Sequence, residues 1–273
     1  MRFGKHVCWA VLALVSGGLC LDAGAELNLW VSYYFAGEDR FGAGDFKEAE
    51  TLLVNGLSET KTAYRQGETL DALGRVYTSQ GRYDDAEKAF QEALCLKRKS
   101  LGGRHREVAV SLNNLADLYY VWGKEDKPES LYRDALDIHR RDQLNVEVCR
   151  ALNGLALIHN ARGEFVEAEE LLKRAIEAHE KAQRREHPFL ATVLVNLGIL
   201  YTNQGRYEEA GPLFDRAAYI QDQVLRADHP DVAVRLHGTS ALYHATGRAK
   251  EAVACASRAQ VIRNKQAEAG NAY

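Results

Sequence analysis

Residues 194–210 have the sequence LVNLGILYTNQGRYEEA, and this stretch decides the fold. Leu194, Leu197 and Tyr201 are three and four residues apart, which is the spacing of one face of an α-helix. Gly205 then supplies the left-handed backbone conformation that ends many helices, and a second helical pattern follows it. The stretch therefore predicts a helix, a tight turn and a second helix.

The pattern Gly-x-aromatic-x-x-Ala recurs along the chain at intervals of 37 to 42 residues. Clear copies begin at Gly44, Gly81, Gly163 and Gly205, and degenerate copies begin at Gly123 and Gly247. Six helical hairpins are therefore expected. In the third hairpin, Glu125 and Pro128 replace the aromatic residue and the alanine, and we expect this change to loosen the hairpin.

Small residues should let the two helices of a hairpin approach closely. They recur at one position of each first helix, for example at Gly74 and Gly198. We expect the aromatic residue just after each turn, such as Tyr83 or Phe165, to fill the gap between the helices. Cationic runs such as 97–99 end the second helices, where they favour the helix dipole.

These residues resemble the tetratricopeptide repeat, and the 42-residue interval resembles the longer repeats of kinesin light chains and related bacterial proteins. The closer match rests on the segment 186–191, EHPFLA, its copy 228–233, DHPDVA, and the string NNLA at 113–116. The resemblance implies an all-α fold, a right-handed superhelical solenoid of about six tetratricopeptide hairpins.

The first residues have a different character from the rest. Arg2 and Lys5 precede an apolar run at 7–15, and Ala23-Gly24-Ala25 follows, which is the order of a secretory signal peptide. An uncleaved anchor and a lipid-modified Cys20 are the alternatives. We expect a signal peptide at 1–25, a divergent N-terminal hairpin at 26–62, a five-repeat solenoid at 63–265 and a frayed tail at 266–273.

Composition argues against several classes of function. The net charge is −3, from 35 basic and 38 acidic residues, so the chain lacks the positive field that holds nucleic acid. After residue 25 no apolar segment is long enough to span a membrane. Three cysteines remain there without C-x-x-C spacing, which gives little support to disulfides or zinc, and Cys95 and Cys255 are expected to pack as small apolar residues.

The resemblance implies a binding groove lined by the first helix of each hairpin. It should present amides, a few charges and an apolar floor, a combination suited to an extended or short helical peptide. The implied residues are Asp71, Arg75, Asn113, Asn114, Asp117, Arg150, Asn153, Leu157, Asn196, Ile199 and His237, with Val195 and His244 beside them. The four asparagines are the best contact candidates. Alternatively, they bond to neighbouring hairpins and bind nothing.

No motif for catalysis, a cofactor or a metal occurs in the sequence. His105, His187 and His229 recur at one repeat position between hairpins, so they are expected to begin helices rather than to form a catalytic cluster. We predict a non-catalytic scaffold or adaptor for an unknown protein or peptide, exported to the periplasm or secreted. The alternative is a structural or self-assembling envelope component that acts through its end repeats.

Overall fold

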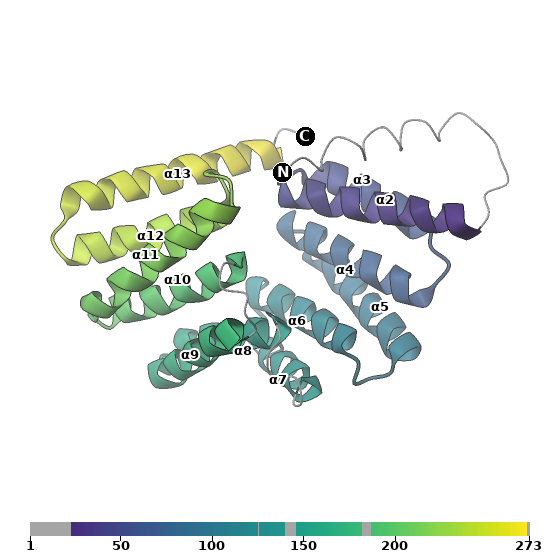
Figure 1. The fold of residues 1–273 in the computed structure, drawn as a ribbon, viewed down its shortest axis with the longest axis horizontal. Helices are drawn as coiled ribbons and strands as arrows, with labels where there is room; N and C mark the ends of the chain where they lie inside the picture. Colours follow the sequence, from purple (N-terminus) through teal and green to yellow (C-terminus); the bar gives the residue numbers. More distant parts are fainter. Residues whose placement is uncertain (1–22, 125, 140–145, 182–186, 272–273) are drawn as a thin grey trace. The chain divides into compact units, whose positions relative to one another are not determined.

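A computed structural model describes residues 23–271 apart from 125, 140–145 and 182–186 (Figure 1). Most of the predicted signal peptide lies outside the described residues, and the expected cleavage point after Ala25 falls in the first turn of the first described helix. The backbone of 266–271, which the sequence suggested would fray, continues the last helix.

The described part of the chain contains twelve α-helices and no strand, as the repeat predicted. The helices are α2 (Ala23–Gly42), α3 (Phe46–Ser58), α4 (Ala63–Ser79), α5 (Tyr83–Leu101), α6 (Arg106–Val121), α7 (Pro128–Ile138), α8 (Val146–Ala161), α9 (Phe165–Lys181), α10 (Pro188–Asn203), α11 (Tyr207–Val224), α12 (Pro230–Ala245) and α13 (Ala249–Asn271). They follow one another as six helix-turn-helix segments, and the all-α repeat architecture is confirmed.

Glycine ends the first helix of every segment by the expected mechanism. All six turn glycines have a positive φ, for example 74° at Gly81 and 76° at Gly205. The next residue then donates its backbone N–H across the turn, as Arg206 does to the carbonyl of Tyr201 at 2.8 Å. This bond satisfies a carbonyl group that the end of the helix would otherwise leave unpaired.

Two compact units make up the chain, residues 1–118 and 119–273. The boundary falls near the end of α6, so the third hairpin is shared between them. The first unit contains α2 to α5 and most of α6, and the second contains α7 to α13.

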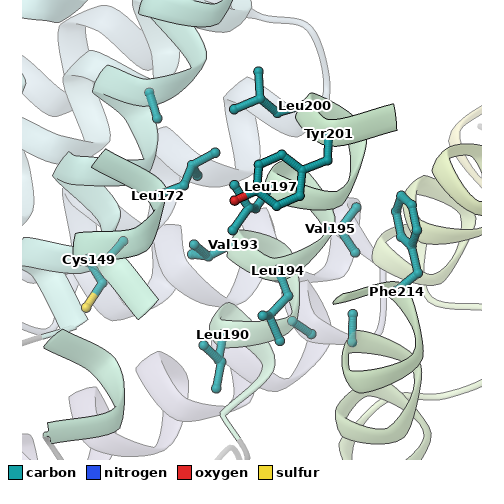
Figure 2. Close-up of a cluster of buried hydrophobic side chains, with 14 of the residues drawn as sticks. Cys149, Leu172, Leu190, Val193, Leu194, Val195, Leu197, Leu200, Tyr201 and Phe214 are labelled. Atoms are coloured by element: carbon teal, nitrogen blue, oxygen red, sulfur yellow. The ribbon is translucent and has the colours of Figure 1, made fainter. Parts of the chain in front are cut away.

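The core of the second unit is an apolar cluster that runs through α8 to α12 (Figure 2). Phe214 on α11 lies between glycines of two neighbouring first helices. A Cβ atom on Gly198 would stand 3.0 Å from its ring, and one on Gly238 would stand 2.8 Å from it. The ring therefore joins the fifth hairpin to the sixth, and glycine is required where the helices approach it.

The first unit packs by the same rule, because the ring of Phe90 on α5 covers Gly74 on α4, where a Cβ would stand 2.5 Å away. Leu53 on α3 covers Gly37 on α2 in the same way. The sequence-based expectation that the residue just after the turn fills this gap was therefore wrong. The gap is filled about two turns further along the second helix, by a residue nine positions after the turn glycine.

Cysteines show a second departure from expectation. Cys149 is buried, and burial raises the pKa of its thiol to about 11. Cys255 packs against the core of the last hairpin as predicted, whereas Cys95 is exposed on α5 and is not a packing residue. Among the described residues, no group of histidine, cysteine or acidic side chains is arranged to hold a metal. None of the described helices is long and apolar enough to cross a membrane.

Candidate functional site

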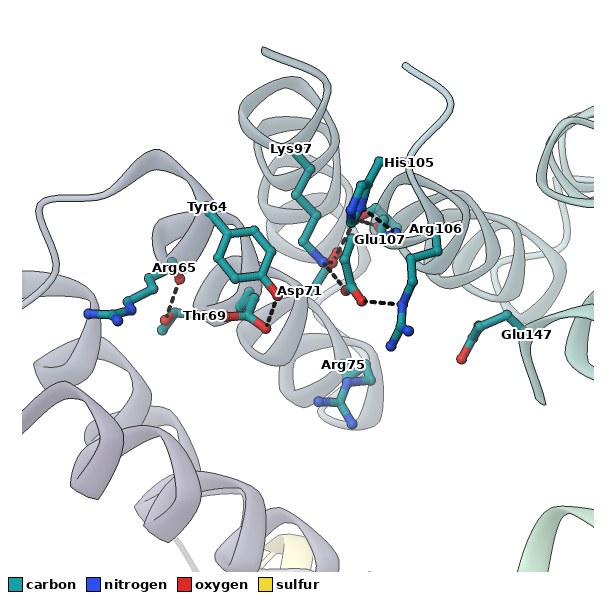
Figure 3. A network of polar contacts seen from close by, with 12 residues as sticks. Tyr64, Arg65, Thr69, Asp71, Arg75, Lys97, His105, Arg106, Glu107 and Glu147 are labelled. Atoms are coloured by element: carbon teal, nitrogen blue, oxygen red, sulfur yellow. Dashed lines mark hydrogen bonds and ion pairs between the residues drawn. The ribbon is translucent and has the colours of Figure 1, made fainter. Parts of the chain in front are cut away.

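In the first unit, the predicted groove residue Asp71 belongs to a buried network (Figure 3). Its Oδ2 accepts a hydrogen bond from Lys97 Nζ at 2.7 Å and another from Ser111 Oγ at 2.6 Å. Asp71 and Lys97 are 4% and 2% exposed. Lys97 belongs to the cationic run that was expected to end the second helix, but its side chain is buried, because Asp71 neutralises it there. The carboxylate therefore joins three helices, α4, α5 and α6.

Other groove predictions of the first unit are also engaged inside the fold. Arg75 on α4 lies 2.5 Å from Glu38 on α2, and its guanidinium group lies 5.3 Å from the centroid of the Phe41 ring. Asn113 and Asn114 are buried on α6, at 0% and 4% exposed, so neither side chain is accessible from solvent. Asp117, one turn further along α6, is partly buried.

In the second unit, two of the predicted asparagines meet each other. Asn196 Nδ2 on α10 donates to Asn153 Oδ1 on α8 at 2.8 Å. Asn153 is 8% exposed, and Asn196 is partly exposed. This pair matches the alternative in which the amides link adjacent hairpins, and it leaves the Asn196 side chain partly open to solvent.

Most of the remaining predicted residues of the second unit are at least partly exposed. Leu157 and Ile199 are partly buried at equivalent positions of α8 and α10, while Val195 is buried. Arg150 is partly exposed on α8 and pairs with Glu147 at 3.2 Å. His237 and His244 are exposed on α12.

These side chains lie on successive first helices, and α10 packs against both α8 and α12. We call their exposed surface the first-helix face and define it by Arg150, Leu157, Asn196, Ile199 and His237. Sequence reasoning missed one apolar member, Val234, which is 48% exposed. Val234 occupies the same position relative to its turn glycine as Arg150 does, so counting from the turn would have found it.

Successive hairpins of the second unit are held in register at the turns. The guanidinium group of Arg206 stacks 3.9 Å from the centroid of the Tyr201 ring and lies 2.5 Å from Glu169 on the preceding hairpin. Tyr201 Oη also donates to Glu169 at 2.9 Å. The pKa of Glu169 is lowered to about 2, mainly by the hydrogen bond from the Arg206 side chain. This carboxylate is therefore ionised at neutral pH.

An equivalent contact in the first unit joins Arg82, Tyr77 and Glu50. The guanidinium group lies 4.3 Å from the ring centroid and 2.8 Å from the carboxylate. In the fourth hairpin, Glu164 replaces the arginine that follows the turn glycine in the second and fifth hairpins. His159 faces Glu164 at 2.5 Å, and Arg162 supplies the cation for the preceding hairpin.

Histidines between hairpins begin helices, as the sequence predicted. The Nδ1 atoms of His105, His187 and His229 each accept a hydrogen bond from the backbone N–H two residues later, at 3.2 Å. This bond satisfies one of the N–H groups that a helix start leaves unpaired. Their recurrence is therefore explained by capping.

The family model described as tetratricopeptide repeat matches residues 65–141, 147–210 and 189–265. The chain belongs to the tetratricopeptide repeat family. Repeats of this family form scaffolds for protein–protein interaction and are generally not enzymes. This membership agrees with the kinesin light chain-like repeats inferred from the sequence.

Protein KINESIN LIGHT CHAIN-RELATED 2 of Arabidopsis thaliana is 29% identical over 119 residues, which cover 42% of this chain and 18% of that protein. The chain thus spans about a fifth of the length of such relatives. The crystal structure of BtubC (BKLC) from P. vanneervenii aligns with a TM-score of 0.58 and 24% identity over 88% of this chain and 92% of its own.

A second structural neighbour is the Rap conjugation gene regulator of the plasmid pLS20 in complex with the Phr* peptide. It aligns with a TM-score of 0.68 and 16% identity, over 97% of this chain and 83% of its own. At such identities both structures show the shared fold alone.

Proposed function

We propose that this tetratricopeptide protein is a non-catalytic adaptor that binds a protein or peptide on the first-helix face. One observation carries the proposal. Apolar side chains at Leu157, Ile199 and Val234 share one surface with Arg150, the exposed His237 and the amide of Asn196. Apolar contact with a few directional polar groups is the usual chemistry of peptide recognition.

The fold supports the same proposal. The Rap regulator was solved in complex with a peptide on a similar helical architecture. The Asn153–Asn196 bond and the Arg206–Glu169 pair hold α8, α9 and α10 in a fixed arrangement, which lowers the entropy that binding would cost.

Affinity capture tests the proposal. Purified protein is compared with a triple variant, Leu157→Ala, Ile199→Ala and His237→Ala, and bound proteins are identified by mass spectrometry. The matched control is Tyr219→Ala with Val224→Ala, two exposed positions on the second helix α11. We expect the triple variant to lose partners that the wild type and the control retain. Partners retained by all three proteins would place the binding surface elsewhere.

Self-association through the last repeat is a second candidate. Val253 and Val261 are 66% and 54% exposed on α13, eight residues apart and therefore on one helical face. A second copy that covered this face would give a molecular mass that rises with concentration. A constant monomer mass over a hundredfold range of concentration would contradict this candidate.

We also propose that the protein is exported, to the periplasm or the medium. The proposal rests on the basic start, the short apolar run and the Ala23-Gly24-Ala25 sequence. Cell fractionation and N-terminal sequencing test it, with a mature chain that begins at Glu26 as the expected result. Full-length protein in the cytoplasm would contradict it.

A further inference from the structure

Two junctions between hairpins of the second unit follow a large-to-small rule. Tyr132 lies nine residues after its turn glycine, and a Cβ atom on Gly154, nine residues before the next turn glycine, would overlap its ring. Phe214 and Gly238 hold the same two positions at the last junction, where the Cβ would stand 2.8 Å from the ring. A large side chain of the preceding hairpin therefore needs a small residue on the following one.

The first unit follows the same rule, and the first and last described hairpins reverse it on their outer faces. Leu53 of the first hairpin packs in one cluster with Ala72 of the second. The first hairpin has Phe35 at the small position, nine residues before its turn glycine, and this side chain is 63% exposed. The last hairpin has Ala256 at the large position, where it is exposed on α13. Both halves of a junction are thus present, with their sizes exchanged.

A valine near Ala256 shows a matching exchange of charge. Val253 lies six residues after its turn glycine and is 66% exposed. At that position Glu50 and Glu169 pair with the arginine that follows the turn glycine of the next hairpin. The first hairpin has Asp45 in place of this arginine, and a carboxylate there would repel a glutamate but not a valine. The two outer faces therefore differ from an internal junction in a coordinated way.

We propose that copies of this chain bind head to tail, with Phe35 of one copy packed against Val253 and Ala256 of the next. We call Phe35 and Asp39 the head face, and Val253 and Ala256 the tail face. Terminal hairpins of soluble solenoids present polar outer faces, so an exposed ring and an exposed valine at stacking positions point to a covering hairpin. The proposal rests on the self-association candidate above, and it adds the second face and the direction of the contact.

Asp39 limits the strength of this contact. It is exposed five residues before its turn glycine. The other five hairpins have a buried apolar residue at that position, namely Val76, Leu118, Ile158, Leu200 and Leu242. Covering Asp39 would place a carboxylate against apolar surface without a partner, which costs free energy. Asp39→Leu should therefore strengthen the association at least tenfold, and an unchanged association would overturn the assignment of the head face.

The first test measures molecular mass by analytical ultracentrifugation, for the full chain and three variants over a hundredfold range of concentration. Phe35→Glu and Ala256→Glu each place a charge in one face. Val261→Glu is the matched control, because this position of α13 and its counterpart Tyr219 are both exposed and lie outside the junctions. We expect at least tenfold weaker association for the two face variants and no change for the control. Circular dichroism checks that each variant is folded.

The outcomes separate this proposal from the candidate on which it rests. A constant monomer mass of the wild type would overturn both. Association that is lost in Val261→Glu but kept in Phe35→Glu would support a contact between two copies of α13 and overturn the head-to-tail contact.

Mixing the two face variants gives the decisive measurement. Phe35→Glu keeps its tail face and Ala256→Glu keeps its head face, so each chain alone should stay monomeric. A head-to-tail contact uses a different surface on each partner, and an equal mixture should therefore form a complex of two chains. Absence of that complex would overturn the proposal.

Discussion

The two units use one repeat position in different ways. Ten residues before the turn glycine, the second hairpin has Asp71, which is buried against Lys97, while the fourth has Asn153, which bonds to Asn196. The first arrangement is a charged pair shielded from water, and the second is a neutral amide pair next to a surface. The difference shows that one helix position can hold either a charged group in the interior or a neutral amide next to the surface, according to the partner that the neighbouring helix supplies.

Breaking the charged arrangement should have the largest effect. Lys97→Ala leaves the carboxylate of Asp71 buried without its cation, and we expect the free energy of unfolding to fall by about 3–5 kcal/mol. Urea unfolding measures the loss. Hydrogen exchange should locate it in α4 to α6, because each hairpin of a solenoid depends mainly on its neighbours.

A charge-free double variant is the control for that experiment. Lys97→Met together with Asp71→Leu removes both charges, so it should be considerably more stable than Lys97→Ala alone. If the single and double variants were equally unstable, packing rather than burial of an unpaired charge would explain the loss.

Close packing in the second unit should give the next largest effect. Gly198→Ala places a Cβ at 3.0 Å from the ring of Phe214, and overpacking of this kind costs about 1–3 kcal/mol. Gly211→Ala in α11 is the control, since its added Cβ meets no atom of another helix within 4 Å. It should be close to neutral, because the higher helix propensity of alanine is offset by crowding against the ring of the following Pro212. Thermal unfolding of the two variants distinguishes contact with the ring from a general effect of glycine.

The turns and the helical hairpins could be predicted from the sequence because they depend on local chemistry. The six glycines, the helix-starting histidines and the 42-residue interval each act within a few residues of the chain. Whether a long polar side chain lies in the interior or at the surface could not be predicted in this way. Lys97 belongs to a cationic run in sequence, and only the packing of α4 and α6 brings Asp71 and Ser111 to it.

The first-helix face shows the same limit. Counting from the turn identified Leu157, Ile199 and His237 at the surface of the second unit, yet it also selected Asp71 and Asn113, which are buried. Equivalent repeat positions differ in exposure because the side chains of the following hairpin differ in size and charge. A single sequence gives the position in the repeat but not the neighbour that covers it.

Removal of the neutral amide pair should have a smaller effect than removal of the buried cation. Asn153→Ala takes away one hydrogen bond, and the partly exposed Asn196 can then bond to water, so we expect a loss of about 0.5–1.5 kcal/mol. Chemical denaturation compares this variant with Lys97→Ala under the same conditions. A loss as large as that of Lys97→Ala would contradict the distinction between the two units.

Acid should weaken the turn contact of the second unit, with the smallest effect of the four. The pKa of Glu169 is lowered to about 2 in the folded chain, mainly by Arg206, and it is near its ordinary value once unfolded. The folded pKa is the lower one, so the contribution to stability is complete above about pH 4.5 and is lost as pH falls toward about 2. Arg206 remains charged throughout, so the loss follows protonation of the carboxylate.

Glu169→Gln isolates this contribution, because glutamine keeps the shape of the side chain and cannot ionise. At pH 7 we expect the variant to be less stable by about 1 kcal/mol or less, the magnitude of a largely solvent-screened ion pair. Between pH 5 and about 2.5 its stability should fall less than that of the wild type, so the two curves of unfolding free energy should converge. Parallel curves over that interval would show that Glu169 contributes nothing through its charge, and that the stacking of Arg206 on Tyr201 and the Asn153–Asn196 bond hold the fourth and fifth hairpins together without it.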